Sequence, residues 1–356
     1  MSRGRLSLPS LGHRRRLLAA LGVPVVLSVA LGGCGGGSDA IVTAAPTQQQ
    51  PLGSTTTANA LTLAGQWPLT GQPLDGDLPS HPVYVVKMDN TSSSAPQVGL
   101  GSADMVVEEL VEGGLTRLAV FFYSDTPDEV GPVRSMRASD VGIAKPAAAT
   151  VVASGGANPT VRLLTADHVS TLTEDASAAG FYRDDSRAAP YNLFMKLSEL
   201  ADEPGRSWTP PTASYLPFGD ASDVTGSVSV TSVAATFSGS HTTTWRHTGA
   251  GWVRSDSFAQ SGDDFVADNV LLLRVKIGDA GYLDPAGNSV PETQFYGYGQ
   301  AILVHGDSAL TCVWHKKDKA SPLTLSTHDG TEVTVPTGHT WVELVPSATG
   351  GVILGK

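Results

Sequence analysis

Residues 83–88 have the sequence VYVVKM, a run of β-branched and aromatic residues with one lysine near its end. Such residues are enriched in strands, so we expect a strand here. The segment LTRLAVFFY at 115–123 has the same character, and VVAS at 151–154 is a shorter run of the same kind. These three segments are the expected strands of the first half of the chain.

Between the first two runs, residues 103–111 show a different pattern. Met105, Val106 and Leu110 fall on one side of a helical projection, and Glu108, Glu109 and Glu112 fall on the other. This spacing predicts an amphipathic helix with a solvated acidic face. Residues 162–175 and 193–201 are two further expected helices. Strands that alternate with helices indicate a mixed α/β domain, which we place at residues 65–205.

The pattern changes after residue 227, where short β-type runs follow one another. Gly, Asp, Asn and Ser punctuate the gaps, as in an antiparallel sheet or small barrel. We therefore predict a β-rich domain over residues 225–350, separated from the first by the proline-rich stretch 204–217. The fold class predicted for the whole chain is α+β. The expected strands are 228–230, 235–237, 244–246, 251–254, 270–277, 300–305, 310–315, 323–326, 332–335 and 340–345.

The N-terminus carries an export signal. Five arginines precede the apolar run 17–31, which ends in Leu31-Gly32-Gly33-Cys34. A basic segment, a short apolar core and small residues before a cysteine resemble the lipobox of bacterial lipoproteins. That resemblance implies a signal peptide at 1–33, cleavage before Cys34, and a diacylglyceryl group, with acyl chains of the palmitate kind, on its thiol. An uncleaved membrane anchor is the alternative, but the run is shorter than the ~20 residues that a spanning helix needs.

The exported chain is strongly acidic. Without residues 1–33, 18 lysines and arginines remain against 34 acids, a net charge of −16. This charge argues against nucleic-acid binding and against adhesion to anionic head groups, so the lipid on Cys34 is the expected membrane attachment. Residues 34–64 are rich in Gly, Ser, Thr and Gln and predict a flexible tether. Cys312 then has no intramolecular partner and is expected to be buried.

Several multi-residue motifs occur in order along the chain. This chain resembles the YerB-like bacterial lipoproteins, a family described as domain of unknown function 3048, over roughly residues 65–348. The family implies no activity by its name. This chain departs from the family pattern at two places. It has Tyr191 where the family pattern has a histidine, and residues 153–156 lack the histidine that is expected before the turn. The segments that carry the resemblance are 88–90 (MDN), 95–100 (APQVGL), 103–104 (AD), 108–117 (EELVEGGLTR), 131–137 (GPVRSMR), a loose match at 183–192, 314–316 (WHK) and 338–346 (GHTWVELVP).

These motifs gather arginines in an otherwise acidic protein. If a helix begins at Ser135 and continues to Pro146, Arg134 and Arg137 lie on one face near its N-terminus. Two guanidiniums at a helix N-terminus form a receptor for phosphate, carboxylate or sulfate, and Arg117 is a third donor. The alternative is that these arginines pair internally with acids of the same motifs, which are Asp89, Glu108, Glu112 and Asp140.

Three functions remain open from the sequence. The first is a binding or scaffolding lipoprotein on the outer face of the cell membrane, which recognises an anionic envelope glycan or a protein partner. The second is an envelope hydrolase of a glycan or phosphodiester, with Asp89 and Glu112 as acid and base. The third is a protein–protein assembly module. The predicted ligand-binding residues are Asp89, Asn90, Glu112, Arg117, Arg134, Arg137 and Asn192.

Other residue types do not indicate a cofactor. The histidines show no zinc-helix spacing, and the glycine pairs at 113–114 and 155–156 are not phosphate loops, so we expect neither a metal nor a cofactor. His241 and His247 flank Trp245 in an expected hairpin, where exposure on a sheet is the simplest interpretation. Trp245, Trp252, Trp314 and Trp341 are expected in the core, with a sugar-stacking surface as the alternative.

Overall fold

The computed structural model describes residues 40–41, 63, 65–176, 179–203, 207–224, 228–285 and 287–356. These residues belong to one compact unit, Asp39–Lys356. The predicted signal peptide, Cys34 and most of the predicted tether lie outside the described residues. Within the described part, no helix is both long enough and apolar enough to span a membrane.

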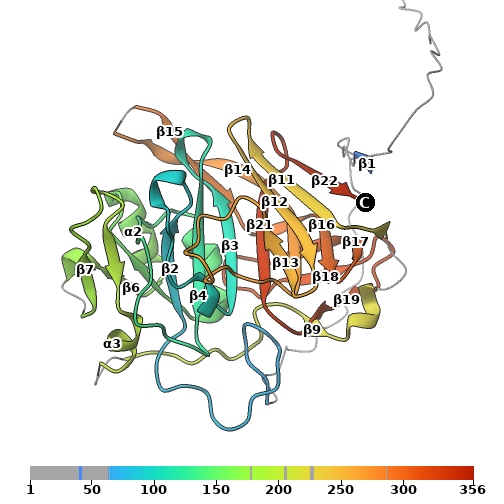
Figure 1. Cartoon of the computed structure of the whole chain (residues 1–356), viewed down its shortest axis with the longest axis horizontal. Coiled ribbons are helices and arrows are strands. Elements are labelled where there is room, and N and C mark those ends of the chain that lie inside the picture. Colours follow the sequence, from blue (N-terminus) through green and yellow to red (C-terminus); the bar gives the residue numbers. More distant parts are fainter. Residues whose placement is uncertain are drawn as a thin grey trace, which may run out of the picture. The chain divides into compact units, whose positions relative to one another are not determined.

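A large mixed sheet forms the centre of this unit (Figure 1). Its middle strands come from both halves of the chain, because β21 pairs in parallel with β14 on one side and with β3 on the other. β10 and β15 pair at its sides. The strands in spatial order are β19 (Glu332–Val333), β18 (Thr324–Ser326), β17 (Ser308–Lys316), β16 (Gly297–His305), β14 (Asn269–Leu283), β21 (Thr340–Pro346), β3 (Met105–Leu110), β4 (Thr116–Phe122), β2 (Tyr84–Asp89), β5 (Thr150–Ala153) and β6 (Thr171–Thr173), with β10 (Val228–Ser229) and β15 (Ser289–Gln294) beside them.

A second sheet lies against one face of the large sheet. Its apolar side chains, among them Val233, Phe237 and Trp245, join the same core as Val86, Val106 and Leu118 of the large sheet. Its strands in order are β1 (Ala40–Ile41), β22 (Gly351–Gly355), β11 (Ser232–Ser238), β12 (His241–Thr248) and β13 (Gly251–Arg254). Two short ladders complete the strands, β9 (Phe218–Gly219) with β20 (Val335–Pro336) and β7 (Phe181–Arg183) with β8 (Leu193–Met195).

Helices contribute to the core on the other face of the large sheet. There Val141, Ile143 and Leu164 pack with Val85, Val107 and Phe121. The α-helices are α1 (Asp140–Ala144), α2 (Asn158–Ala166) and α3 (Leu197–Ala201). The 3₁₀ helices are η1 (Ser92–Ser94), η2 (Leu100–Ser102), η3 (Glu112–Gly114), η4 (Lys145–Ala147), η5 (Glu174–Ala176) and η6 (Ala221–Val224).

The structure confirms the strands predicted at 83–88, 115–123 and 151–154, which are β2, β4 and β5. Strands also occupy each of the runs predicted after residue 227, and no helix follows η6 in the described part of the chain. Trp245, Trp252, Trp314 and Trp341 are buried, as is Cys312. The protein is therefore strand-rich with few helices, and its helices belong to the N-terminal part.

The predicted helix at 103–111 is wrong, because this segment is strand β3. β3 lies between β21 and β4 in the large sheet, and its alternate residues enter the different cores on the two faces of that sheet. Glu108 and Glu109 are fully buried rather than solvated. Their spacing matches the polar face of a helix. In the structure, however, each binds partners that are distant in the sequence.

Three other predicted helices are displaced. The helix expected at 135–146 begins only at Asp140, so Arg134 and Arg137 precede it in extended and turn backbone. α2 begins earlier than expected, with a proline in its first turn, and ends before β6. Residues 193–195 are a strand, and only Leu197–Ala201 is helical. The continuous sheet also joins the two predicted domains 65–205 and 225–350 at the β3–β21 pairing.

Candidate functional site

Polar side chains gather where β2 and β3 end and β4 begins, and strand alternation divides them between the two faces of the large sheet. On the helix-covered face lies the helix-face cluster. It consists of Lys87, Asp89, Glu109, Glu112, Arg117, Arg134, Arg137 and Asp140. Between the sheets lies the inter-sheet cluster. It consists of Asn90, Glu108, Thr116, His241, Thr243, Trp245, Arg254 and Glu343.

Lys87 is the centre of the buried end of the helix-face cluster. Its ammonium donates to Glu109 Oε1 at 2.8 Å and to Asp140 Oδ1 at 2.6 Å, and all three side chains are fully buried. The pKa of Lys87 is raised overall. Burial alone would lower it, but the charges and hydrogen bonds of Asp140 and Glu109 outweigh this effect. Asp140 also accepts the Arg137 backbone N–H at 2.7 Å, which fixes the start of α1. This triad joins β2, β3 and α1.

Asp89 connects the buried and exposed parts of the cluster. Its Oδ2 accepts from Arg117 Nη1 and lies 3.1 Å from Arg134 Nε. Its Oδ1 accepts the backbone N–H of Thr91 at 2.9 Å and the Thr91 hydroxyl at 2.5 Å. Both oxygens of this buried carboxylate are therefore engaged within the protein.

Arg134 lies at the outer end of this network. Its Nη1 donates to the Pro190 carbonyl at 3.2 Å, and its guanidinium lies over the Tyr191 ring, 5.2 Å from the centroid. The Arg134 side chain is 21% exposed, compared with 14% for Arg137 and 6% for Arg117. Arg134 is thus the most accessible of the three predicted arginines, and it is held on two sides.

Glu112 and Arg137 form a separate ion pair at the rim. Arg137 donates to Glu112 Oε2 through Nε at 3.0 Å and Nη2 at 2.8 Å, and its Nη1 binds the carbonyls of Ser135 and Met136.

The turn that follows Glu112 requires glycine at position 114. The φ of Gly114 is +73°, and a Cβ atom there would lie 2.9 Å from the Ser238 and Ser240 hydroxyls. Ser238 donates to the Gly114 carbonyl at 2.6 Å, which ties the turn to the second sheet.

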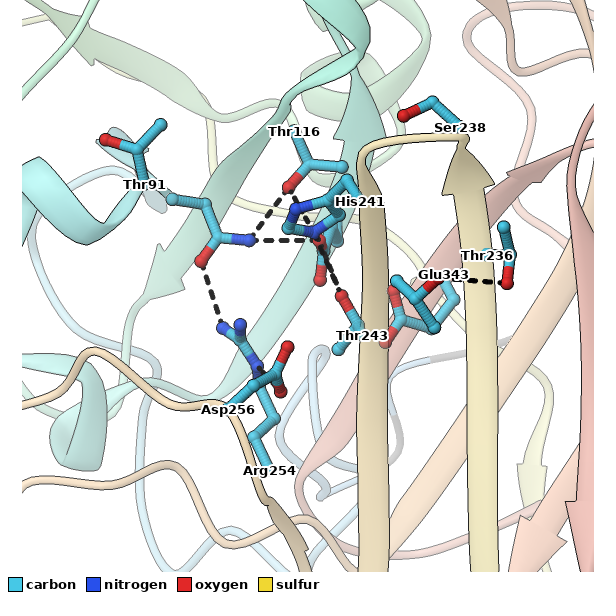
Figure 2. Close-up of polar contacts among 12 residues, drawn as sticks. Thr91, Thr116, Thr236, Ser238, His241, Thr243, Arg254, Asp256 and Glu343 are labelled. Atoms are coloured by element: carbon cyan, nitrogen blue, oxygen red, sulfur yellow. Dashed lines mark hydrogen bonds and ion pairs between the residues drawn. The ribbon is translucent and has the colours of Figure 1, made fainter.

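Glu108 accepts most of the hydrogen bonds of the inter-sheet cluster. Figure 2 shows its members Thr116, His241, Thr243, Arg254 and Glu343. Oε1 of Glu108 accepts from Asn90 at 2.9 Å and from Thr243 at 2.9 Å, and it lies 2.9 Å from His241 Nε2. Arg254 donates to the Asn90 carbonyl oxygen, Oδ1, at 3.1 Å. The prediction that His241 is simply exposed on a sheet is wrong, because its ring points into this cluster.

Glu343 adds a second buried carboxyl beside Glu108. The two residues are direct neighbours in the parallel pairing of β3 and β21, and both are fully buried. Trp245 Nε1 donates to Glu343 Oε1 at 2.7 Å. Burial and the charge of Glu108 raise the pKa of Glu343 well above its usual range. Burial also opposes ionisation of Glu108, but its hydrogen bond with His241 and the Arg254 charge lower that pKa to about 2.

A shared proton follows from this arrangement. As two carboxylates, Glu108 and Glu343 would each leave a buried Oε2 without a partner among the described residues. A proton on Glu343 makes it a donor to Glu108, which removes both deficits and the repulsion between like charges. The pKa shifts therefore favour the neutral form of Glu343 and the ionised form of Glu108.

The structure brings five of the seven predicted ligand-binding residues into the helix-face cluster. These are Asp89, Glu112, Arg117, Arg134 and Arg137. Asn90 belongs instead to the inter-sheet cluster, because it follows Asp89 and points to the opposite side. Asn192 binds Arg183, which pairs with Glu174.

Sequence reasoning missed Lys87, His241, Arg254 and Glu343 as members of these clusters. Lys87 was the one charge inside an apolar run, which was an available signal for a buried ion pair. Glu343 similarly interrupts the run of β21. Neither residue had a visible partner nearby, because Glu109 and Glu108 lie far from them in the sequence.

This fold defines a class of strand-rich proteins in which a mixed sheet carries α1 and α2 on one face, and a second sheet that shares its core with α3 on the other. Residues 69–207 match the N-terminal domain of the protein family of unknown function DUF3048, and residues 232–342 match its C-terminal domain. These matches cover more than half of the chain, so the chain belongs to this family. The resemblance seen in the motifs is confirmed.

Similar proteins agree with this assignment. The chain is 32% identical over 144 residues to a Bacillus subtilis (strain 168) protein named "Putative lipoprotein YerB", over 39% of this chain and 43% of that protein. The match thus spans less than half of the relative's length. The crystal structure of YerB from Bacillus subtilis superposes with a TM-score of 0.67, over 81% of this chain and 99% of the other, at 20% identity. That likeness shows a common fold.

Proposed function

We propose that this protein is a lipid-anchored binding protein of the cell envelope that holds an anionic ligand at the outer end of the helix-face cluster. Cys34 would carry the lipid and residues 35–64 would extend the compact unit away from the membrane. The lipobox-like sequence at residues 31–34 supports the anchor. The name of the YerB relative agrees with it.

The exposed edge of Arg134 is the observation that carries the proposed ligand site. The Asp89 carboxylate at Nε and the Pro190 carbonyl at Nη1 hold the guanidinium, which lies over the Tyr191 ring. A guanidinium held in this way loses little side-chain entropy when it binds an anion. Because the exported chain is strongly acidic, its field repels anions, and a local contact of this kind is needed to hold one.

The arrangement favours binding over hydrolysis. A general acid or base must be free to exchange a proton with the substrate. Both oxygens of Asp89 accept hydrogen bonds from the protein, and Arg137 occupies Oε2 of Glu112. The proposed catalytic pair is thus closed onto its own arginines, and we favour a ligand with a phosphate or carboxylate group on an envelope glycan.

A thermal-shift titration tests the ligand site. The chain without residues 1–34 is mixed with muropeptides, teichoic-acid fragments, sugar phosphates and inorganic phosphate. We expect at least one to raise the Tm of the wild type, and Arg134→Gln to abolish that rise. Arg246→Gln is the matched control, since Arg246 is an exposed arginine on β12. Equal shifts in wild type and Arg134→Gln would exclude this site.

The anchor has an independent test in the source bacterium. We expect Cys34→Ala to prevent lipid attachment, to remove the acyl mass from the N-terminal peptide and to lower the membrane-bound fraction. A Cys312→Ala variant is the control, because Cys312 is buried and remote from the signal. An unchanged acyl mass in Cys34→Ala would refute lipidation at this residue.

A further inference from the structure

A cavity of about 320 Å³ lies apart from both polar clusters. Its walls come from the C-terminal ends of η4 and α2, the residues that begin or precede β5 and β6, and the segment 207–209. A volume near 300 Å³ is at the lower end of small-molecule sites and suits one or two sugar rings. The lining includes Lys145, Ala148, Thr150, His168, Ser170 and Trp208.

The backbone around this cavity is unusual. Among the described residues, the non-glycine residues with positive φ are Ala148, at 49°, and His168, at 56°, and both line the cavity. Each follows the end of a helix, where glycine is the preferred residue. Left-handed backbone without glycine costs on the order of 1 kcal/mol or more, and such residues gather at functional sites. His168 therefore occupies a position where glycine would be more stable.

Trp208 is the aromatic residue of the cavity. All six tryptophans lie in the described part of the chain. Four are buried in the cores and Trp67 packs against one of them, whereas Trp208 joins neither core and is half-buried at the cavity wall. An indole ring in this setting offers an apolar face to a ligand.

Polar residues line the same cavity. Thr150 is 7% exposed and lines the cavity. Lys145 donates to the Asp167 carbonyl at 2.9 Å, with the Asp167 carboxylate 3.8 Å away, so its ammonium is fixed and largely neutralised. His168 and Ser170 also line the cavity. These groups can both donate and accept hydrogen bonds.

We propose that this cavity binds a saccharide whose C–H face stacks on Trp208 while its hydroxyl groups bond to Thr150, His168 and Lys145. An apolar ring face combined with hydroxyls at the ring edge matches this lining, whereas a purely apolar ligand would leave its polar groups unpaired. The site is separate from Arg134, so it does not depend on the anion site proposed above. A neutral and an anionic sugar share this chemistry, and the choice of probe distinguishes them.

Saturation-transfer-difference NMR tests the proposal on the chain without residues 1–34, which contains the whole compact unit. The probes are methyl β-glucoside, N-acetylglucosamine and glucuronate, and glycerol is the acyclic control. We expect transfer to the ring C–H protons of at least one sugar and none to glycerol. Trp208→Ala should weaken binding about tenfold. Tyr298→Ala, which removes another exposed aromatic ring, should leave it unchanged.

A pair of glycine variants separates binding from folding. His168→Gly and Ala148→Gly both relieve left-handed backbone, so both should keep or raise the Tm. Only His168→Gly removes an imidazole, and we expect only this variant to lose binding severalfold. The proposal is overturned if no ring sugar exceeds glycerol, if Trp208→Ala binds like the wild type, or if His168→Gly binds as well as Ala148→Gly.

Discussion

The helix-face cluster and the inter-sheet cluster both take residues from β3 and β4, but they differ in the ratio of cations to acids. The first contains four cations, Lys87, Arg117, Arg134 and Arg137, and four acids, Asp89, Glu109, Glu112 and Asp140. The second contains the acids Glu108 and Glu343 with Arg254 and the ring of His241.

This difference has a physical consequence. A cation that faces a buried carboxylate favours its ionised form, whereas burial without enough cations favours the protonated form. The helix-face cluster can therefore present charge at its solvent edge, where Arg134 is exposed. The inter-sheet cluster lies between the two sheets, and Glu108 joins them through its bonds to His241 and Thr243.

Lys87→Met should have the largest effect on stability. It leaves Glu109 and Asp140 buried without their shared cation, and breaking such a pair costs about 3–5 kcal/mol. Urea unfolding measures the loss. Lys196→Met is the control, because the Lys196–Glu199 pair is solvent-exposed and should contribute little. A loss for Lys87→Met no larger than that for Lys196→Met would show that the triad does not stabilise the fold.

The two buried glutamates should respond unequally to the same substitution. Glu108→Gln removes the charge that His241 and Arg254 face and should cost about 2–3 kcal/mol. Glu343→Gln replaces a carboxyl whose raised pKa favours the neutral form, and it should cost less than about 1 kcal/mol. Comparing both in urea unfolding locates the proton. Equal costs would contradict a proton held on Glu343.

Stability should also depend on pH in opposite directions for the two residues. The pKa of Glu343 is raised on folding, so its contribution is complete below the unfolded value of about 4.3 and declines as pH rises through the raised pKa. The pKa of Glu108 falls to about 2, so its contribution is lost as pH drops from about 4.3 toward 2.

Free energies of unfolding measured across this pH range test both directions. Glu343→Gln should flatten the decline on the alkaline side, and Glu108→Gln should flatten the decline on the acidic side. Parallel curves for wild type and both variants would mean that neither group changes its pKa on folding.

Arg134→Gln should have the smallest effect on stability, about 0.5–1 kcal/mol, because the side chain is partly solvated and Arg117 still pairs with Asp89. Its effect on ligand binding should be much larger than its effect on Tm. Chemical unfolding without ligand measures the first quantity. A loss of several kcal/mol would identify Arg134 as a mainly structural residue.

The sequence predicted the strands well because their signal is local. In β2, β4 and the strands after residue 227, β-branched and aromatic residues follow one another between turn residues. It failed at β3 because three glutamates in a short apolar segment match a helical period as well as a buried strand. Only the contacts of Glu108 with β12 and of Glu109 with Lys87 distinguish the two.

The candidate site was predictable in its residue types but not in its arrangement. The motifs identified Asp89, Glu112 and the three arginines as one group, and the alternative of internal pairing was open from the start. The helix expected to orient Arg134 and Arg137 begins at Asp140 instead, because Asp140 is fixed by Lys87. Trp208, Thr150 and His168 carried no local signal as a site, since they come from separate segments.

By itself the sequence determined the family, the lipobox-like N-terminus, the acidic charge of residues 34–356 and most strands, because each depends on composition or on residues close together in the chain. The tertiary structure decided which acids are ionised, which arginine reaches solvent and where a cavity forms. These properties depend on burial and on distances between residues that are remote in the sequence, and burial sets the free-energy difference between charged and neutral forms.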